Sequence, residues 1–153
     1  MVTLKEITSD NYEECLALQV LDDQKDFVAP NVKSLAEAWV FPTAARPFAI
    51  YNDDVMVGFL MVDIDPNLEG SNELCYLWRF MIDAKYQGRG YGKAAMQEVI
   101  NYVKINFNPK TFETSTAPGA DVAEKLYNSF GFIPNGKYYD DEKVLVLKMR
   151  NES

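Results

Sequence analysis

The chain contains the stretch Gln87-Gly88-Arg89-Gly90-Tyr91-Gly92-Lys93, which follows the apolar run 77–82 and opens an amphipathic pattern. A strand thus leads into a glycine-rich turn and then into a helix. Glycine has no Cβ to block the approach of a ligand to the backbone, and the first N–H groups of a helix have no intrahelical acceptor. The helix dipole favours an anion at those donors, and Arg89 and Lys93 add positive charge. The stretch therefore predicts a site for a pyrophosphate.

Apolar periodicity on both sides of this turn predicts an α/β protein with one mixed sheet and helices on both faces. The expected strands span residues 2–7, 47–51, 55–64, 73–83, 111–116, 132–139 and 144–149. The expected helices span 12–21, 34–40, the segment from the glycine turn to about 107, and 118–130. Asp10 and Glu13 predict a capping box at the start of the first helix. Gly131 predicts that the last helix ends in the left-handed conformation, and we expect a turn at residues 66–70.

Length and composition predict one domain spanning residues 1–153, with 48% hydrophobic and 25% charged residues as in ordinary folded proteins. No apolar stretch approaches the roughly 18 residues that span a bilayer, and the N-terminus lacks a secretory signal. We therefore expect a cytoplasmic protein with no membrane partner. Cys15 and Cys75 are too few for a disulfide framework, so we expect them to be reduced and partly buried.

The absence of histidine excludes much chemistry, because Ser-His-Asp triads, Cys-His pairs and most catalytic zinc sites need an imidazole. We expect no metal, and any base must be a carboxylate, a tyrosine, a lysine or water. A formal net charge of −8 argues against a broad nucleic-acid surface. The charge mildly favours cationic partners, although it can equally serve solubility alone.

A second motif, Ala123-x-x-Leu126-Tyr127-x-x-x-Gly131-Phe132, lies at a predicted helix-to-strand junction. Together with the turn, which has the form Gln-x-x-Gly-x-Gly, it resembles the GNAT acetyltransferase superfamily. The resemblance covers nearly the whole chain in element order and residues 77–132 in motif detail. It implies the GNAT fold, a single layer of about seven mostly antiparallel strands with helices on both faces. A Rossmann dinucleotide site is the competing interpretation, which the Gly-x-Gly-x-Gly spacing and the mid-chain position disfavour.

The resemblance implies acetyl-coenzyme A as cosubstrate and assigns site residues. The backbone of Phe80, Met81 and Ile82 would bind the pantetheine arm, and the turn would bind the diphosphate. The turn residues in that role are Gln87, Gly88, Arg89, Gly90, Tyr91, Gly92 and Lys93. Tyr127 would be the general acid toward the departing thiolate, and a core tyrosine with no catalytic role is the alternative. Ala120 stands where the family often has an asparagine that contacts coenzyme A, so we assign no cofactor contact to it.

Within the superfamily, the segments 79–83 and 85–90 and the tripeptide Glu142-Lys143-Val144 look most like bacterial spermine/spermidine acetyltransferases. That likeness implies direct attack of a polyamine on the thioester in a ternary complex, with the oxyanion held by a backbone N–H of the strand 73–83. We take Glu73 as the candidate base, with a solvated strand-end charge as the alternative. Related enzymes are often dimers, so a homodimer is a further expectation.

The substrate stays open at this point. Acidic and aromatic residues suited to a polyamine are Asp22, Asp23, Asp26, Trp39, Phe41, Tyr76 and Trp78. One alternative is a GNAT acetyltransferase for another amine, namely an aminoglycoside, an amino acid or a protein amine. Another is a non-catalytic module that binds acyl-coenzyme A. Cys75 without a histidine neighbour is not expected to act as a nucleophile.

Overall fold

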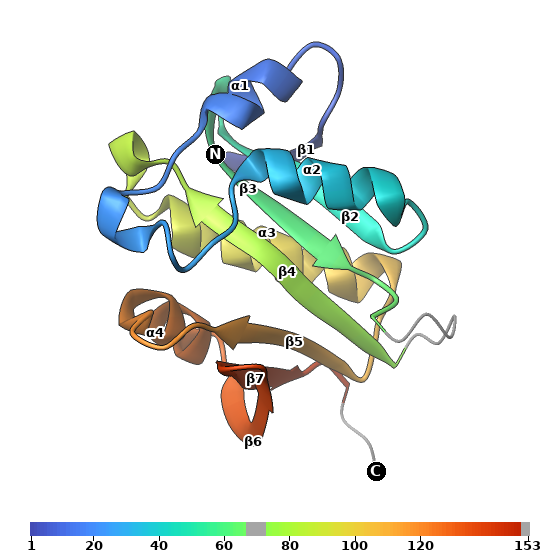
Figure 1. Cartoon of the computed structure of the whole chain (residues 1–153). Coiled ribbons are helices and arrows are strands. Elements are labelled where there is room, and N and C mark those ends of the chain that lie inside the picture. The colour runs from blue at the N-terminus through green and yellow to red at the C-terminus, as the bar shows by residue number, and fades with distance from the viewer. Residues whose placement is uncertain (67–72, 151–153) are drawn as a thin grey trace.

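A computed structural model describes residues 1–66 and 73–150, and Figure 1 shows one sheet with helices on both of its faces. The strands are β1 (Val2–Glu6), β2 (Ala45–Asn52), β3 (Val55–Asp63), β4 (Leu74–Ile82), β5 (Thr111–Thr116), β6 (Ile133–Tyr139) and β7 (Glu142–Lys148). They lie in the order β1-β2-β3-β4-β5-β7-β6. β4 and β5 pair in parallel, and the other neighbours pair antiparallel. The predicted seven-stranded, mostly antiparallel sheet is confirmed.

The helices form a layer on each face of the sheet (Figure 1). They are α1 (Tyr12–Ala17), α2 (Asn31–Val40), α3 (Tyr91–Asn106) and α4 (Asp121–Ser129), with short 3-10 turns η1 (Asp22–Gln24) and η2 (Ala84–Tyr86). α3 and α4 pack on one face, where Leu60, Val99 and Phe112 are fully buried. α1 and α2 cover the other face, around Phe59 and Met61. Because both faces of β3 are covered, its sequence is continuously apolar.

The start and end of α1 differ from the prediction. Its N-cap is Asn11 rather than Asp10, and no side chain caps it, so the predicted capping box is wrong. The Asn11 side chain turns back instead, and its Oδ1 accepts a hydrogen bond from the N–H of Thr8 at 2.8 Å. The helix ends at Ala17 because the following backbone binds the end of β4. There the N–H of Gln19 donates to Oδ1 of the buried Asp83 at 2.8 Å.

Two other predicted segments also change. α2 begins three residues earlier than predicted, at Asn31, whose buried side chain donates from Nδ2 to the carbonyl oxygen of Cys15 at 2.9 Å. The segment between the first two helices contains η1. The turn predicted at 66–70 lies, apart from its first residue, outside the described residues. Gly131 follows α4 with φ of 96°, as predicted for a left-handed helix end.

β4 and β5 separate after a short paired stretch, which creates the opening on which the site depends. They pair only from Leu74 with Thr111 to Tyr76 with Glu113. Where they diverge, Oγ1 of Thr114 donates to the carbonyl oxygen of Leu77 at 3.1 Å. A register shift between β3 and β4 occurs at the same level and leaves Trp78 without a partner in β3. Such a bulge bends a strand away from its neighbour, and here it re-aims the side chains that follow.

Both cysteines are fully buried, more completely than predicted, at 0% and 1% exposure. Burial raises the pKa of the Cys15 thiol to about 11 and that of Cys75 to about 12. A thiol with so high a pKa carries almost no thiolate at neutral pH, which disfavours Cys75 as a nucleophile. In the described part of the chain, no helix is long and apolar enough to cross a membrane. No cluster of His, Cys, Asp or Glu in that part is arranged to hold a metal ion.

Candidate active site

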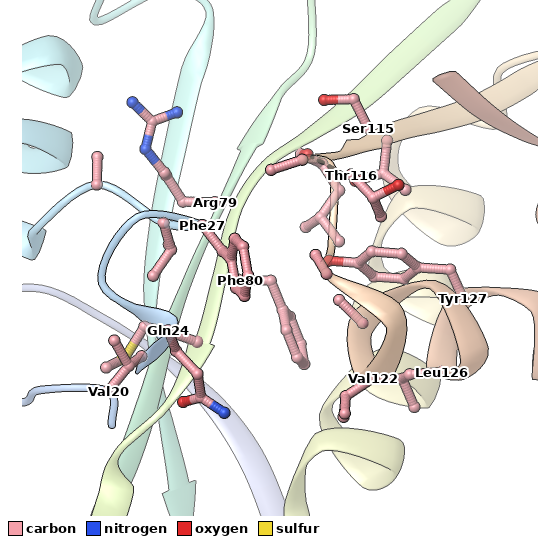
Figure 2. A pocket seen from close by; sticks show the side chains of 18 of the residues that line it. Val20, Gln24, Phe27, Arg79, Phe80, Ser115, Thr116, Val122, Leu126 and Tyr127 are labelled. Atoms are coloured by element: carbon pink, nitrogen blue, oxygen red, sulfur yellow. Dashed lines mark hydrogen bonds between the residues drawn. The ribbon is translucent and has the colours of Figure 1, made fainter. Parts of the chain in front are cut away.

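A cavity of about 1270 Å³ lies where β4 and β5 separate, and its walls come from both faces of the sheet. Gly88, Gly90 and Gly92 line it near the C-terminal end of β4, and Tyr76 lines it near the start of that strand. The connection between α1 and α2 forms one wall, and β5 and α4 form the other (Figure 2). The cavity therefore connects the glycine turn with the point where the two strands diverge.

The glycine turn leaves helix donors free at the cavity. Gly88 and Gly90 have φ of 77° and 85°, a conformation that L side chains rarely adopt. Gly90 is the N-cap of α3, no side chain caps this end, and the N–H of Ala94 donates to the carbonyl of Gly90 at 3.1 Å. The N–H groups of the first helical residues, 91–93, therefore have no intrahelical acceptor. This geometry suits the predicted anion.

Gly92 differs from the other two glycines. Its φ is not positive, and a Cβ there would lie 3.7 Å from the side chains of Ile82 and Leu126, an ordinary van der Waals distance. Neither the backbone conformation nor the packing of α3 therefore requires glycine at this position. Tyr91 also lines the cavity, and its hydroxyl accepts from Nδ2 of Asn52 at 3.1 Å. The side chains that bring positive charge to the turn, Arg89 and Lys93, are exposed.

The free edge of β4 presents the backbone of alternate residues. The backbone N–H of Asp83 donates to the carbonyl oxygen of Val57 on β3 at 2.8 Å. Residues two apart on a strand present their backbone N–H and C=O to the same neighbour, so those of Met81 also face β3. Those of Phe80 and Ile82 face the opening instead. The carbonyl of Ile82 accepts from Nε2 of Gln87 at 2.9 Å. Of the three residues predicted to bind a pantetheine arm, Phe80 and Ile82 have the suitable orientation.

Two glutamines join the glycine turn to the loop on the other side of the cavity. Nε2 of Gln87 donates to Oε1 of Gln24 at 2.8 Å, and Nε2 of Gln24 donates to Oε1 of Gln87 at 3.1 Å. Gln24 belongs to η1, and in the same loop the ring of Phe27 lies beside Gly119 of the β5–α4 connection. The sequence predicted Gln87 as part of the turn but gave no signal for Gln24, because a pair 63 residues apart has no local pattern.

Tyr127 reaches from α4 into the cavity, with its hydroxyl at the cavity side (Figure 2). It is only 6% exposed, and its ring packs edge-on against Phe80 at 6.4 Å and tilted against Phe132 at 5.9 Å. Burial raises the pKa of its phenol above the usual 10, and a hydrogen bond with Thr114 acts in the opposite direction. The group is therefore a neutral proton donor at physiological pH, as a general acid must be.

A hydrogen-bonded chain that the sequence did not reveal lies at the other end of the cavity. The hydroxyls of Tyr76 and Ser115 are hydrogen-bonded to each other, and Oγ of Ser115 donates to Oε1 of Glu142 at 2.7 Å. All three residues line the cavity. They come from β4, β5 and the start of β7, so no spacing along the sequence links them. Burial raises the pKa of Tyr76 to about 12.

The other predicted residues divide between this cavity and the rest of the surface. Glu73 is exposed, pairs with Lys110 at 3.1 Å and Arg150 at 3.5 Å, and is not among the described residues that line the cavity. Trp39 is 85% exposed on α2 and borders a separate, smaller hollow. Of the acids predicted to bind a polyamine, Asp23 and Asp26 line the cavity, whereas Asp22 pairs with Lys25 at 2.8 Å. Tyr76 and Trp78 line the cavity, and Phe41 lies 6.4 Å from Trp78.

Comparison with known proteins agrees with this geometry. Residues 4–132 match the model of the acetyltransferase (GNAT) family. The chain belongs to the GNAT acetyltransferase family. It is 29% identical over 151 residues to the spermine/spermidine N(1)-acetyltransferase of Bacillus subtilis (strain 168), covering 97% of this chain and 99% of that protein. The expected resemblance and fold class are thus confirmed, and the Rossmann alternative is excluded.

Two solved acetyltransferase structures share the fold. The spermidine N-acetyltransferase of Vibrio cholerae, in complex with CoA and spermine, aligns with a TM-score of 0.75 at 14% identity, covering 97% of this chain and 95% of that one. The aminoglycoside acetyltransferase AAC(6')-Ib, in complex with coenzyme A, aligns with a TM-score of 0.79 at 13% identity, with the same two coverages. Identities this low establish the fold and leave the acceptor open.

Proposed function

We propose that this GNAT protein transfers the acetyl group of acetyl-coenzyme A to a primary amine of a polyamine such as spermidine or spermine. The observation that carries the proposal is the cavity that joins free helix N–H groups at the glycine turn to the hydroxyl of Tyr127. The cavity extends from the glycine turn to the strand divergence, which suits an extended cosubstrate that enters at the turn and places its reactive end between β4 and β5. The near full-length similarity to a spermine/spermidine acetyltransferase supports the polyamine.

Different residues along this cavity bind different parts of the cosubstrate. The N–H groups of residues 91–93 hold the diphosphate, and the turn from Gln87 to Lys93 shapes the approach. The backbone of Phe80 and Ile82 binds the pantetheine arm as an added strand would. The thioester then lies beside Tyr127, which donates its proton to the sulfur as the thiolate leaves. A backbone N–H of β4 at the divergence point stabilises the oxyanion.

The chemistry at the other end of the cavity supports a cationic acceptor. Asp140 and Glu142 line it there together with the aromatic rings of Tyr76 and Trp78. Arg79 also lines the cavity, but its Nη2 lies 2.8 Å from Oε1 of Glu37, and both side chains are mostly buried. This ion pair neutralises the arginine, so Arg79 does not cancel the negative charge of Asp140 and Glu142. Carboxylates attract ammonium groups, and aromatic faces suit both these groups and the methylene stretches between them.

Turnover with a panel of amines tests the proposal. The purified protein is given acetyl-coenzyme A and spermidine, spermine, kanamycin, lysine or a lysine-containing peptide, and thiol release and product mass are measured. We expect the highest kcat/KM with a polyamine. A higher value with kanamycin, lysine or the peptide would assign the enzyme to that acceptor. Binding of acetyl-coenzyme A by calorimetry with no thiol release for any amine would identify the non-catalytic module.

We also propose that residues 1–153 act as one domain, as a cytoplasmic homodimer that binds no nucleic acid. The family match over most of the chain supports a single domain. Light scattering on the eluting protein measures the oligomeric state, and a monomeric mass at micromolar concentration would contradict the dimer. Limited proteolysis that left two stable fragments would contradict the single domain.

A further inference from the structure

The chain of Tyr76, Ser115 and Glu142 has a defined direction. A serine hydroxyl carries one proton, and that of Ser115 is donated to Oε1 of Glu142 at 2.7 Å. In the hydrogen bond between Tyr76 and Ser115, the phenol must therefore be the donor. Each proton in the chain thus points toward the carboxylate. The lone pairs of the Tyr76 oxygen are left at the start of the chain, where they can accept one more proton.

The chain lies across the strand divergence from Tyr127. Tyr76 precedes Leu77, whose carbonyl oxygen accepts from Oγ1 of Thr114 at 3.1 Å, and Thr114 also bonds the phenol of Tyr127. Tyr127 packs in the cluster on the α3–α4 face, and so do Cys75 and Leu77, the neighbours of Tyr76 on β4. Because successive side chains of a strand point to opposite faces, that of Tyr76 points to the α1–α2 face. A thioester between the strands would thus have a proton donor on one side and this chain on the other.

Such an arrangement supplies what aminolysis of a thioester requires. An alkylamine has a pKa near 10 and must lose a proton in the course of the reaction, while the departing thiolate must gain one. Burial raises the pKa of Tyr76 to about 12, with the negative charge of Glu142 as a smaller cause, so the phenol stays neutral and cannot be the final acceptor. The carboxylate at the end of the chain can be.

We propose that Tyr76, Ser115 and Glu142 form a relay that takes the proton from the acceptor amine. An N–H bond of the bound ammonium breaks as an O–H bond forms on Tyr76, and the electron pair left on nitrogen makes it the free amine that attacks the thioester. The proton that Tyr76 held passes to Ser115, and that of Ser115 passes to Glu142, which becomes a neutral carboxylic acid and later loses the proton to solvent. Tyr76 is the residue that touches the amine, and Ser115 and Glu142 act through it. The relay rests on the proposed acetyltransferase function and replaces Glu73 as base.

The charged and titratable groups around the relay form hydrogen bonds or ion pairs elsewhere, or add negative charge, and none of them takes the place of a relay residue. The ring of Tyr139, on β6, lies 5.7 Å from that of Tyr76, and its hydroxyl donates to Oε1 of Glu113 at 3.1 Å. Asp140 in the β6–β7 turn adds a negative charge, and Arg79 adds a positive one that Glu37 pairs. Lys143, the residue after Glu142 on β7, binds both carboxylate oxygens of Glu124 through Nζ at 3.2 Å.

The alternative is that the three residues only brace β4, β5 and β7, and a set of matched variants separates the two roles. Ser115→Ala breaks the chain, and Glu142→Gln keeps its shape but removes the carboxylate. Ser115→Thr keeps a hydroxyl and serves as the conservative rescue. Glu113→Gln is the control, because it removes the same charge as Glu142→Gln. Glu113 lies two residues before Ser115 on β5 and is not among the described residues that line the cavity.

The measurement is kcat/KM for the best amine as a function of pH, with acetyl-coenzyme A affinity measured by calorimetry. We expect a loss of about 100-fold at pH 7 for Ser115→Ala and Glu142→Gln, the lower end of general acid–base contributions. The loss should shrink as the pH rises toward the amine pKa of about 10, because the free amine no longer needs the relay. Ser115→Thr should recover most of the rate, and Glu113→Gln should match the wild type.

Each outcome decides one claim. A loss for Ser115→Ala and Glu142→Gln that is the same at every pH would show a structural brace and overturn the relay. Wild-type rates in Glu142→Gln would also overturn it, and this variant tests the relay even if Ser115→Ala fails to fold. No turnover by the wild type with any amine would refute the proposed function, and the relay with it. Normal wild-type turnover with unaffected variants would refute the relay alone.

Discussion

Replacing Tyr127 by phenylalanine removes one hydroxyl and leaves the rest of the site in place. The ring contacts with Phe80 and Phe132 persist because they involve the ring alone. The variant loses the hydrogen bond with Thr114, whose own bond to the carbonyl of Leu77 remains. One such bond contributes about 1 kcal/mol, which corresponds to a fall in Tm of roughly 2–4 °C for a chain of this length. The fold should therefore survive.

The catalytic effect should be much larger than the structural one. General acid catalysis contributes about 10²–10⁴-fold, so kcat for the best amine should fall by that factor, equivalent to roughly 3–5 kcal/mol of activation free energy. The affinity for acetyl-coenzyme A should stay within about twofold of the wild type, because the hydroxyl acts only as the thiolate leaves. Since burial raises the pKa of Tyr127, its ionisation should cause no loss of wild-type activity between pH 6 and about 9.

Steady-state thiol release, calorimetry with acetyl-coenzyme A and thermal unfolding measure the three quantities. Tyr102→Phe is the control, since Tyr102 lies on α3 and packs edge-on against Phe48 at 4.9 Å, away from the cavity. It removes an equivalent hydroxyl and should keep the wild-type rate. Unchanged kcat in Tyr127→Phe would remove the phenol from the mechanism. An equal loss in cofactor affinity would show instead that the hydroxyl shapes the binding site.

Three further predictions follow from the turn, the loop and the buried thiols. Gly90→Ala should lower the unfolding free energy in urea titrations by about 1–2 kcal/mol, because φ at this position is 85°. No neighbouring side chain or backbone lies within 4 Å of the added Cβ, so the cost comes from the backbone conformation alone. The substitution should also weaken acetyl-coenzyme A binding, and wild-type affinity would contradict the diphosphate site. Gln24→Ala should raise KM for the amine, because the loop that carries Asp23 and Asp26 loses its hydrogen bonds to Gln87 while the bond from Gln87 to Ile82 remains; an unchanged KM would separate the loop from acceptor binding. The buried thiols of Cys15 and Cys75 have pKa values raised from 9.0 to about 11 and about 12, so their stabilising effect is complete below pH 9 and declines as pH rises toward those values. Urea unfolding from pH 7 to 11 should show that decline, and a flat profile would contradict it.

Local patterns predicted most of the fold because strands and helices with one apolar side show their period directly in the sequence. The end of α1 is one exception, since its periodicity extends to Leu21 but the helix ends at Ala17. The hydrogen bonds of Gln19 with the end of β4 outweigh the local helical preference there. A contact between residues 64 positions apart leaves no periodic signal, so the sequence could not predict this end.

The sequence by itself determined the sheet, the glycine turn and the position of Tyr127 on a helix before Gly131, because each depends on neighbouring residues. Only the tertiary structure decided which side chains meet in the cavity. It placed Glu73 outside with Lys110 and brought Glu142 to Ser115 instead. The physical reason is the separation of β4 from β5, which no local pattern encodes and which gathers groups from distant strands around one opening.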